Sequence, residues 1–318
     1  IYNAAYAVSS GRFKNVLALG VEKMSLLDTK GVTHALACSS YWPDEGSMGV
    51  TFPGLFGELA KAYQAKHGMS DEELRSMFAH VAAQNYRNGI QNPMAHFGPG
   101  SLPDKNQLVT AEAIMNLPDS GKGSNPMIAA PLRLHDCSLI SDGAAAVVLT
   151  STDNAKANFK HAVELSGIGH VTQRMMMSQR KETLHELQAA KHAVQQACTE
   201  AGVKVTDMDL AEVHDCFTIN QMLCAEAMGL SEQGRAGYDF IDGKYDVDSD
   251  CPINLSGGLK SKGHPVGATG ASMHALMYKQ LTGAPIGVAA KGQPELAMTV
   301  NIGGSGVTNC VSVMRRIQ

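Results

Sequence analysis

The sequence predicts an α/β fold built in layers, and three observations support this prediction. Continuous apolar runs of strand length lie at residues 15–21 (NVLALGV) and 142–151 (DGAAAVVLTS), as in strands covered on both faces. Helical patterns alternate with such strands near both ends of the chain. At 318 residues, the chain is also long enough for a substantial core and about two domains.

Between these two strands, residues 28–140 predict a large insertion of helices and loops. Residues 52–68 have a helical pattern that ends at a glycine, and a second helix begins at the capping box of Ser70 and Glu73. Residues 91–126 are rich in proline, glycine and asparagine, which predicts irregular structure. Loops on a rigid scaffold commonly hold substrate, so both a binding role and plain surface decoration stay open for this insertion.

After the insertion, strands and helices alternate regularly. Residues 183–202 carry an apolar stripe and end at a glycine, which predicts an amphipathic helix. A short strand leads into His214, and a further helix follows it. A helix from Pro265 to about Leu281 precedes two final strands, which a glycine turn joins at residues 303–306. The end of the chain therefore repeats the alternation seen at its beginning.

Composition argues against several classes of function. A net charge of −4 and an isoelectric point near 6.3 leave no basic stripe for nucleic acid. No apolar run is long enough to predict a membrane span. The seven cysteines form no C-x-x-C pair, which favours a reducing compartment over a disulfide framework or structural zinc. We expect the cytoplasm, because the final MRRIQ is no peroxisomal signal, and a mitochondrial presequence stays open.

The first candidate for chemistry is VHDCFTINQM, with a histidine, an aspartate and a cysteine in a row at residues 214–216. Thr218 and Gln221 fit a capping box, so a helix is predicted to begin directly after the cysteine. A helix N-terminus stabilises a thiolate, and we therefore expect Cys216 to have a lowered pKa and to serve in proton transfer. The alternative is a small buried cysteine that closes a strand.

The second candidate is the loop NLSGGLKSKGHPVGATG at residues 254–270, in which His264 stands directly before a proline. Proline suits the first position of a helix, which places His264 near a helix N-terminus. The positive helix end disfavours imidazolium, so His264 is expected to be neutral at physiological pH and able to accept a proton. The many glycines suggest that a ligand approaches the backbone, although a structural histidine is the alternative.

Two further segments are weaker candidates. In TVNIGGSGVTN, residues 299–309, a strand ends in glycines whose N–H groups, above all that of Gly303, can point at an oxyanion. A plain hairpin turn is the alternative. LHDCSLISDG, residues 134–143, repeats the order His-Asp-Cys but leads into a strand and not into a capped helix. We therefore interpret His135 and Cys137 as structural.

Together, these segments resemble the thiolase superfamily. The loop at 254–270 is similar to the thiolase signature N-x-x-G-G...G-H-P-x-G-x-T-G. HDCF is typical of the sterol-carrier-protein type, in which it replaces the N-E-A-F motif of common thiolases. NIGGSG places Asn301 where common thiolases have the cysteine of C-x-G, which the sterol-carrier type also lacks. LALGVEKM, NPMAHF and SDGAAAVVL extend the resemblance over essentially the whole chain.

The resemblance implies a particular α/β architecture, the thiolase fold. Its two similar βαβαβαββ halves form a layered α-β-α-β-α arrangement, with a large loop-domain insertion in the first half. The first half would comprise residues 1–27 and 141–158, the loop domain on the substrate and CoA side residues 28–140, and the second half residues 159–318. The family also pairs its chains, so we expect a homodimer or homotetramer.

The implied activity is a Claisen-type acyl exchange on CoA thioesters, either thiolytic cleavage of a 3-ketoacyl-CoA or the reverse condensation. His264 would be the base that activates the nucleophilic cysteine, and Cys216 would be the second acid/base. His214 would hold the thioester or enolate oxygen, and the N–H of Gly303 would contribute to a second oxyanion hole. Acyl-CoA and CoA are then the expected partners, as substrates, with no tightly bound cofactor and no metal.

Two positions depart from the family pattern. The family's nucleophilic cysteine lies at the start of the helix that IYNAAYAVSS resembles, about two turns before Ile1, and none of the seven cysteines can take that place. Because Ile1 also follows no capping residue, we expect that the sequence begins inside a helix and lacks its start. Lys260 stands where the signature prefers an aliphatic residue, which we attribute to an exposed loop edge.

Several alternatives stay open at this point. A natural relative without the nucleophile would be a CoA-thioester aldolase or a non-catalytic CoA-binding partner subunit. A pure binding or scaffold protein is a second possibility. A metal site would use His214, Cys216 and His264 as zinc ligands, although the close ligand pairs typical of zinc sites are absent.

Overall fold

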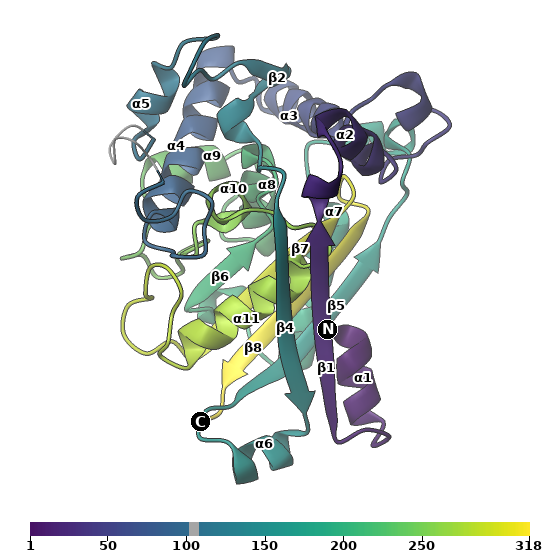
Figure 1. The fold of residues 1–318 in the computed structure, drawn as a ribbon, viewed down its shortest axis with the longest axis vertical. Coiled ribbons are helices and arrows are strands. Elements are labelled where there is room, and N and C mark those ends of the chain that lie inside the picture. The colour runs from purple at the N-terminus through teal and green to yellow at the C-terminus, as the bar shows by residue number, and fades with distance from the viewer. Residues whose placement is uncertain (102–107) are drawn as a thin grey trace.

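Two β-sheets form the framework of the protein in the computed structural model, which describes residues 1–101 and 108–318 (Figure 1). One sheet pairs β1 with β4 antiparallel, and the other has the strand order β5-β8-β7-β6. In the second sheet β6 and β7 are parallel, whereas β8 is antiparallel to both of its neighbours. The strands are β1 (Asn15–Lys23), β2 (Met127–Ala129), β3 (Leu132–Arg133), β4 (Asp142–Thr150), β5 (Val163–Thr172), β6 (Leu210–Val213), β7 (Leu296–Gly303) and β8 (Thr308–Arg316).

Helices lie between the sheets, on one outer face and in the insertion between β1 and β4, and one short helix joins β4 to β5. They are α1 (Tyr2–Ser9), α2 (Thr29–Ala37), α3 (Phe52–His67), α4 (Asp71–Gly89), α5 (Ala111–Met115), α6 (Thr152–Asn158), α7 (Gln188–Ala201), α8 (Thr218–Met228), α9 (Ala236–Ile241), α10 (Gly258–Lys262) and α11 (Thr269–Leu281). Between the sheets, α11 contacts both, and α1 packs on β1 and β4 while its Tyr2 hydroxyl donates to the carbonyl of Val311 in β8. On the far face of the four-stranded sheet, α7 and α8 bury their apolar sides. The predicted α/β layered fold is confirmed.

Several predicted elements have the expected bounds, and two begin later. Ser70 and Glu73 do form the capping box of α4. The helix predicted at 183–202 begins only at Gln188, because the preceding residues form tight 3₁₀ turns. The helix predicted from Pro265 begins at Thr269, after a turn in which the Pro265 carbonyl accepts two backbone N–H groups. Within residues 1–101 and 108–318, no helix has the length and apolarity that a bilayer span requires.

The prediction that β1 and β4 are covered on both faces is wrong for the described residues. One face packs on α1 and α11. On the other face Leu17, Leu19 and Val148 are 60%, 63% and 66% exposed. A continuous apolar run therefore did not distinguish a strand covered on both faces from one with an open apolar face.

The insertion joins two neighbouring strands. Lys23 ends β1 and pairs with Asp142, the first residue of β4, so that residues 24–141 leave and re-enter the sheet at one point. Its main helices, α3 and α4, pack on α8, α9 and α10 of the second half. In Figure 1 the insertion lies at the end of the sheets toward which β1 points. It therefore lies against the segments that carry His214 and His264.

The carboxyl of Glu226 in α8 is buried where α3 meets the second half. Tyr63 donates its hydroxyl to Glu226 Oε1 at 2.6 Å, and the N–H groups of Gly234 and Ala236 donate to the same oxygen at 3.0 and 3.2 Å. Burial raises the pKa of Glu226 to about 7. The folded protein therefore holds a proton here that the unfolded chain releases in mildly acidic solution.

We expect Glu226→Gln to remove a pH-dependent loss of stability. Because the folded state binds more protons between the ordinary carboxyl pKa of 4.5 and about 7, the wild-type free energy of unfolding falls as pH rises through this window. The variant should therefore gain ~3 kcal/mol relative to the wild type across the window. Urea unfolding at several pH values measures this gain, and an identical pH dependence for both proteins would contradict it.

Candidate active site

His214 lies at the carboxyl end of β6, where parallel strands of an α/β sheet commonly place functional groups. Its N–H donates to the carbonyl of Val300 in β7 at 2.9 Å, which extends the pairing of the strands by one residue. Its ring Nδ1 lies 2.8 Å from Oδ1 of Asn301, also in β7. Because an amide oxygen only accepts, Nδ1 of the neutral ring carries the proton and donates to Asn301 in this arrangement; the opposite orientation of the Asn301 amide would place the proton on Nε2. Asn301 therefore orients the ring.

His264 is held by two hydrogen bonds in the turn between α10 and α11. Its N–H donates to Ser141 Oγ at 2.9 Å, and its ring Nδ1 lies 2.7 Å from Thr269 Oγ1. The Thr269 hydroxyl donates its own proton to the carbonyl of Pro265 at 3.1 Å. Its oxygen is therefore an acceptor toward the ring, so Nδ1 carries the proton and Nε2 is left unprotonated. This tautomer suits a general base that acts through Nε2.

Replacing Thr269 with valine should disturb this tautomer. Valine keeps the shape of the side chain but removes the oxygen that accepts the proton of Nδ1, which leaves a buried donor unpaired at ~1–3 kcal/mol. Long-range ¹H–¹⁵N NMR spectra should show the Nδ1–H form of His264 in the wild type and a shift toward Nε2–H in the variant. Thr282→Val is the control, because Thr282 ends the same helix and its hydroxyl donates only to carbonyls of that helix, those of Tyr278 and Lys279. An unchanged His264 spectrum would contradict the assignment.

The rings of His214 and His264 meet edge to face, with their centroids 4.9 Å apart at 86°. Burial lowers the pKa of His214 to about 4. Burial, followed by the neighbouring His214 and the charge of Lys262, lowers the pKa of His264 well below its ordinary value. The prediction of a neutral His264 thus has the correct direction, but burial is the main cause and the helix begins five residues later.

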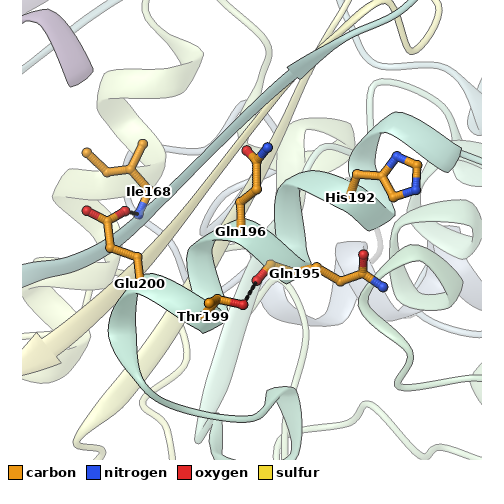
Figure 2. A pocket seen from close by; sticks show the side chains of 6 residues that line it. All are labelled: Ile168, His192, Gln195, Gln196, Thr199 and Glu200. Atoms are coloured by element: carbon orange, nitrogen blue, oxygen red, sulfur yellow. Dashed lines mark hydrogen bonds between the residues drawn. The ribbon is translucent and has the colours of Figure 1, made fainter.

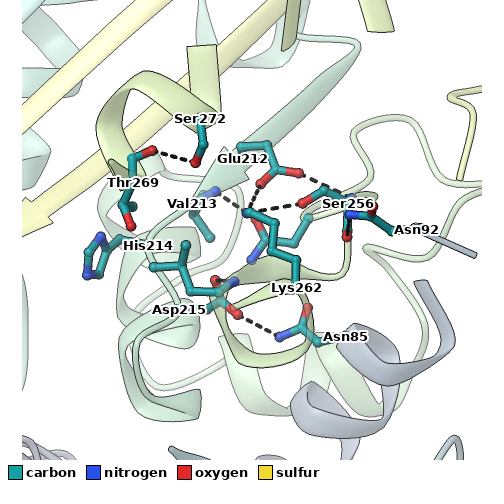
Figure 3. A network of polar contacts seen from close by, with 12 residues as sticks. Asn85, Asn92, Glu212, Val213, His214, Asp215, Ser256, Lys262, Thr269 and Ser272 are labelled. Atoms are coloured by element: carbon teal, nitrogen blue, oxygen red, sulfur yellow. Dashed lines mark hydrogen bonds and ion pairs between the residues drawn. The ribbon is translucent and has the colours of Figure 1, made fainter. Parts of the chain in front are cut away.

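Figure 3 shows a buried ion pair next to the segment that carries His214. Lys262 Nζ lies 3.2 Å from Glu212 Oε2 and 3.2 Å from Ser256 Oγ, and the side chain of Glu212 is fully buried in β6. The positive charge of Lys262 opposes protonation of both rings. The sequence reasoning missed this pair. A glutamate inside the apolar strand MDLAEV was the signal, because a buried carboxylate requires a cation or several donors.

Asp215 holds the loop that leads to His264. Its buried carboxylate accepts the N–H groups of Leu259 and Lys260 at 2.6 and 3.0 Å and the side-chain amide of Asn85 at 3.0 Å. Burial raises the pKa of Asp215 to about 6, against the charge of Lys262. A Cβ on Gly258 would collide with this carboxylate, and Gly258 has φ +59°. At this position glycine permits close packing of protein on protein.

The glycines of this loop were predicted to admit a ligand, and that reason is wrong for the two whose contacts are clearest. Besides Gly258, Gly267 lies against β1, where a Cβ would meet the carbonyl of Val21. Its N–H donates to Glu22 at 3.2 Å. The turn behind His264 therefore rests directly on the first-half sheet.

Cys216 has properties opposite to those predicted. It is 1% exposed, and burial, followed by the charge of Asp215, raises its pKa well above the ordinary value. The predicted capping box is also wrong, because Phe217 is the N-cap of α8 and no side chain caps it. Burial therefore outweighs the helix dipole, and the thiol is protonated. The described residues include no hydrogen bond from its sulfur to either histidine ring.

Gly303 is the last residue of β7 and lies opposite Thr308 of β8. The turn between the two strands is the hairpin that was the alternative prediction. Asn301 and Gly303 are two residues apart on one strand, so they face the same side, the less buried side of β7. The oxyanion role of Gly303 stays a prediction that its position permits.

The second His-Asp-Cys stretch, at residues 135–137, lies next to the first one, which its sequence context did not indicate. Cys137 forms an antiparallel bridge with Phe217, and the N–H of Ser138 donates to the carbonyl of Cys216 at 2.9 Å. The two similar stretches thus lie side by side. Lys260, predicted at an exposed loop edge, is only 1% exposed, and its Nζ donates to the hydroxyl of Tyr86 in α4.

The zinc alternative lacks a ligand set. Among residues 1–101 and 108–318, no three histidine, cysteine or acidic side chains gather as metal ligands.

A hollow at the surface of α7 and β5 (Figure 2) is lined by neither His214 nor His264. Two of its polar groups are already engaged, since Glu200 accepts the N–H of Ile168 at 2.7 Å and Thr199 donates to the carbonyl of Gln195.

Comparison with known proteins identifies the family. Residues 1–153 match the model of the thiolase N-terminal domain, and residues 169–316 match that of the thiolase C-terminal domain-like family. The chain belongs to the thiolase superfamily. The acetyl-CoA acetyltransferase of Methanothermobacter thermautotrophicus is 39% identical to this thiolase-family chain over 310 residues, which are 98% of the chain and 75% of that protein.

One further relative and one solved structure extend the comparison. Sterol carrier protein 2 of Oryctolagus cuniculus is 28% identical over 294 residues, which cover 87% of this chain and 49% of that protein. The solved structure of an Ltp2-ChsH2(DUF35) aldolase has a TM-score of 0.79 at 21% identity and covers 99% of this chain and 75% of its own. This structure shares the thiolase fold. With HDCF at the site, the chain is a sterol-carrier-protein-type member of the superfamily.

Proposed function

We propose that this protein is an acyltransferase of the thiolase type that cleaves 3-ketoacyl-CoA with CoA or runs the reverse Claisen condensation. The observation that carries the proposal is the neutral His264, whose Nε2 is unprotonated beside the edge of the His214 ring. Thiol activation requires a base with a free lone pair, and the neighbouring imidazole of His214 is the group that we propose binds the oxyanion at the same carbonyl.

In the proposed reaction, His264 takes the proton of the attacking thiol, and the thiolate adds to the 3-keto carbon. His214 and the N–H of Gly303 stabilise oxyanions. The C2–C3 bond then breaks, which leaves the acyl group on the attacking sulfur as a thioester, and the electron pair of the broken bond forms the enolate of acetyl-CoA, which an acid must protonate. Where the attacking thiol is a cysteine, the thiol of CoA then displaces that cysteine and leaves as acyl-CoA. Because burial raises the pKa of Cys216, its thiol suits this donor role better than that of a base. Acyl-CoA and CoA are the substrates, and no tightly bound cofactor is required.

Thiolysis of acetoacetyl-CoA tests the proposal. One acetoacetyl-CoA and one CoA should give two acetyl-CoA with the protein as its organism makes it. Absence of thiolysis and of condensation would reject the proposal.

We further propose a role in fatty acid or lipid metabolism, assembly as a homodimer or homotetramer, and a cytoplasmic location. Sedimentation tests the oligomeric state, and cell fractionation tests the location.

A thiolase-like protein without a nucleophile, such as a CoA-thioester aldolase or a non-catalytic CoA-binding partner subunit, is the second candidate. What supports it is the fold that the chain shares with the solved structure of an Ltp2-ChsH2(DUF35) aldolase. A retro-aldol cleavage needs a base for the substrate hydroxyl but no attacking thiol. CoA-independent cleavage of a 3-hydroxyacyl-CoA, with an intact mass near 33.7 kDa for the natural protein, would support this candidate.

A further inference from the structure

Lys260 has an unusual environment for a lysine of a glycine-rich loop. Its ammonium is buried, and Nζ donates to the hydroxyl of Tyr86 in α4 at 2.8 Å. The ammonium also lies 4.9 Å from the centroid of the Tyr86 ring and 5.8 Å from that of Phe97. Both aromatic residues belong to the insertion. The side chain of Lys260 is therefore anchored in the insertion by one hydrogen bond and by cation–π attraction.

The hydrogen bonds around Tyr86 have a fixed direction. The Tyr86 hydroxyl lies 2.7 Å from Nδ1 of His135, and burial lowers the pKa of His135 to about 3. The ring is therefore neutral and able to accept a proton in a hydrogen bond. Since an ammonium only donates, the Tyr86 oxygen accepts from Lys260 and its proton points to His135. The chain of donors runs from Lys260 through Tyr86 to the second His-Asp-Cys stretch.

The ammonium is also the countercharge for groups in both similar stretches. Asp136 and Cys137 face it from the stretch at residues 134–137, and Asp215 faces it from the connection between β6 and α8. Burial lowers the pKa of Lys260 to about 8, and it raises that of Asp136 to about 6 against the charge of Lys260. A neutral side chain at this position would remove the larger of two cationic contributions at the buried Asp136 and leave only that of Arg133.

The backbone of Lys260 is bound to a different part of the protein from its side chain. Its N–H and that of Leu259 donate to Asp215, which belongs to the second half of the fold. The next turns of the same loop contain Lys262 and His264. Lys260 thus joins the insertion, through Tyr86 and His135, to the segment that carries the proposed base.

We propose that Lys260 is a positioning residue that holds the His264 turn in register with the helical insertion through its ammonium on Tyr86. Its effect on catalysis rests on the proposed thiolase function, whereas its effect on the loop does not. The insertion and the base are then fixed relative to each other, which matters if a substrate bound along the insertion must meet His264 Nε2 within a fraction of an ångström.

The test uses Lys260→Met, which keeps the length of the side chain and removes its charge, with Lys191→Met on the exposed side of α7 as the matched control. Hydrogen exchange followed by mass spectrometry should show residues 257–264 exchanging at least about 10-fold faster in Lys260→Met, with α7 unchanged. Thiolysis should lose about 10- to 100-fold in kcat with KM for acetoacetyl-CoA within about threefold of the wild type.

A second variant covers the case in which Lys260→Met does not fold. Tyr86→Phe removes only the hydroxyl and keeps the ring, and it should show the same local exchange to a smaller degree. If residues 257–264 exchange at the wild-type rate in the folded variants, the inference is overturned. An active wild type with an unchanged kcat in Lys260→Met also overturns it. An inactive wild type rejects the proposed function, and exchange alone then decides on Lys260.

Discussion

His264→Ala should lower kcat/KM for thiolysis of acetoacetyl-CoA by about 10²- to 10⁴-fold, because a positioned general base contributes that much. The wild-type ring has its unprotonated Nε2 fixed by the bond from Nδ1 to Thr269, and alanine offers no acceptor in its place. Steady-state kinetics with both variants measure the loss. His192→Ala, on the exposed side of α7, is the control and should retain wild-type rates.

The pH profile gives an independent check on the same base. Since the pKa of His264 lies well below its ordinary 6.5, the ring keeps its lone pair as pH falls through 6.5. Wild-type kcat/KM should therefore show no acid limb at that value, and the limb should appear only at lower pH. An unimpaired His264→Ala, or an acid limb centred on 6.5 that this variant abolishes, would contradict the environment assigned to the base.

Gly258→Ala should destabilise the protein by ~3 kcal/mol or more, since it combines a left-handed backbone with a steric collision. The new Cβ would meet the Asp215 carboxylate, which is already committed to Leu259, Lys260 and Asn85. Urea unfolding measures the loss. The expected consequence for activity is a strong fall in kcat, because the same loop positions His264.

Gly202→Ala is a matched control for this substitution. Gly202 ends α7 with φ +65°, close to the +59° of Gly258, but no atom lies within 4 Å of the position that a Cβ would occupy there. Its replacement should therefore cost only the ~1–2 kcal/mol of the left-handed conformation. Equal losses for the two variants would show that the contact with Asp215 has no cost.

The sequence predicted the layered α/β fold and most element bounds because these depend on local patterns. The capping box at Ser70, the helix after His214 and the final hairpin each lie within a few residues of one another in the chain. The resemblance of the glycine loop and of HDCF to one family directed attention to His214 and His264, and the structure brings these two rings together.

What the sequence could not predict depends on burial and on contacts between distant segments. A helix N-terminus at Cys216 suggested a lowered pKa, but full burial reverses the direction. Lys260 stood in a polar, glycine-rich loop and yet is enclosed by Tyr86, more than 170 residues away in the chain. Glu212 and Lys262 are likewise paired only in three dimensions. No local pattern contains these partners.

The pairing of β1 with β4 has a consequence for folding kinetics. Their register joins Lys23 to Asp142, so the whole insertion must be ordered or looped out before this sheet can close. Loop-closure entropy grows slowly with length, at about 0.6 kcal/mol for each doubling, and strand pairing of this sequence separation is slow. We therefore expect the two strands to dock late, with weakened pairing in β1 or β4 speeding unfolding more than it slows folding.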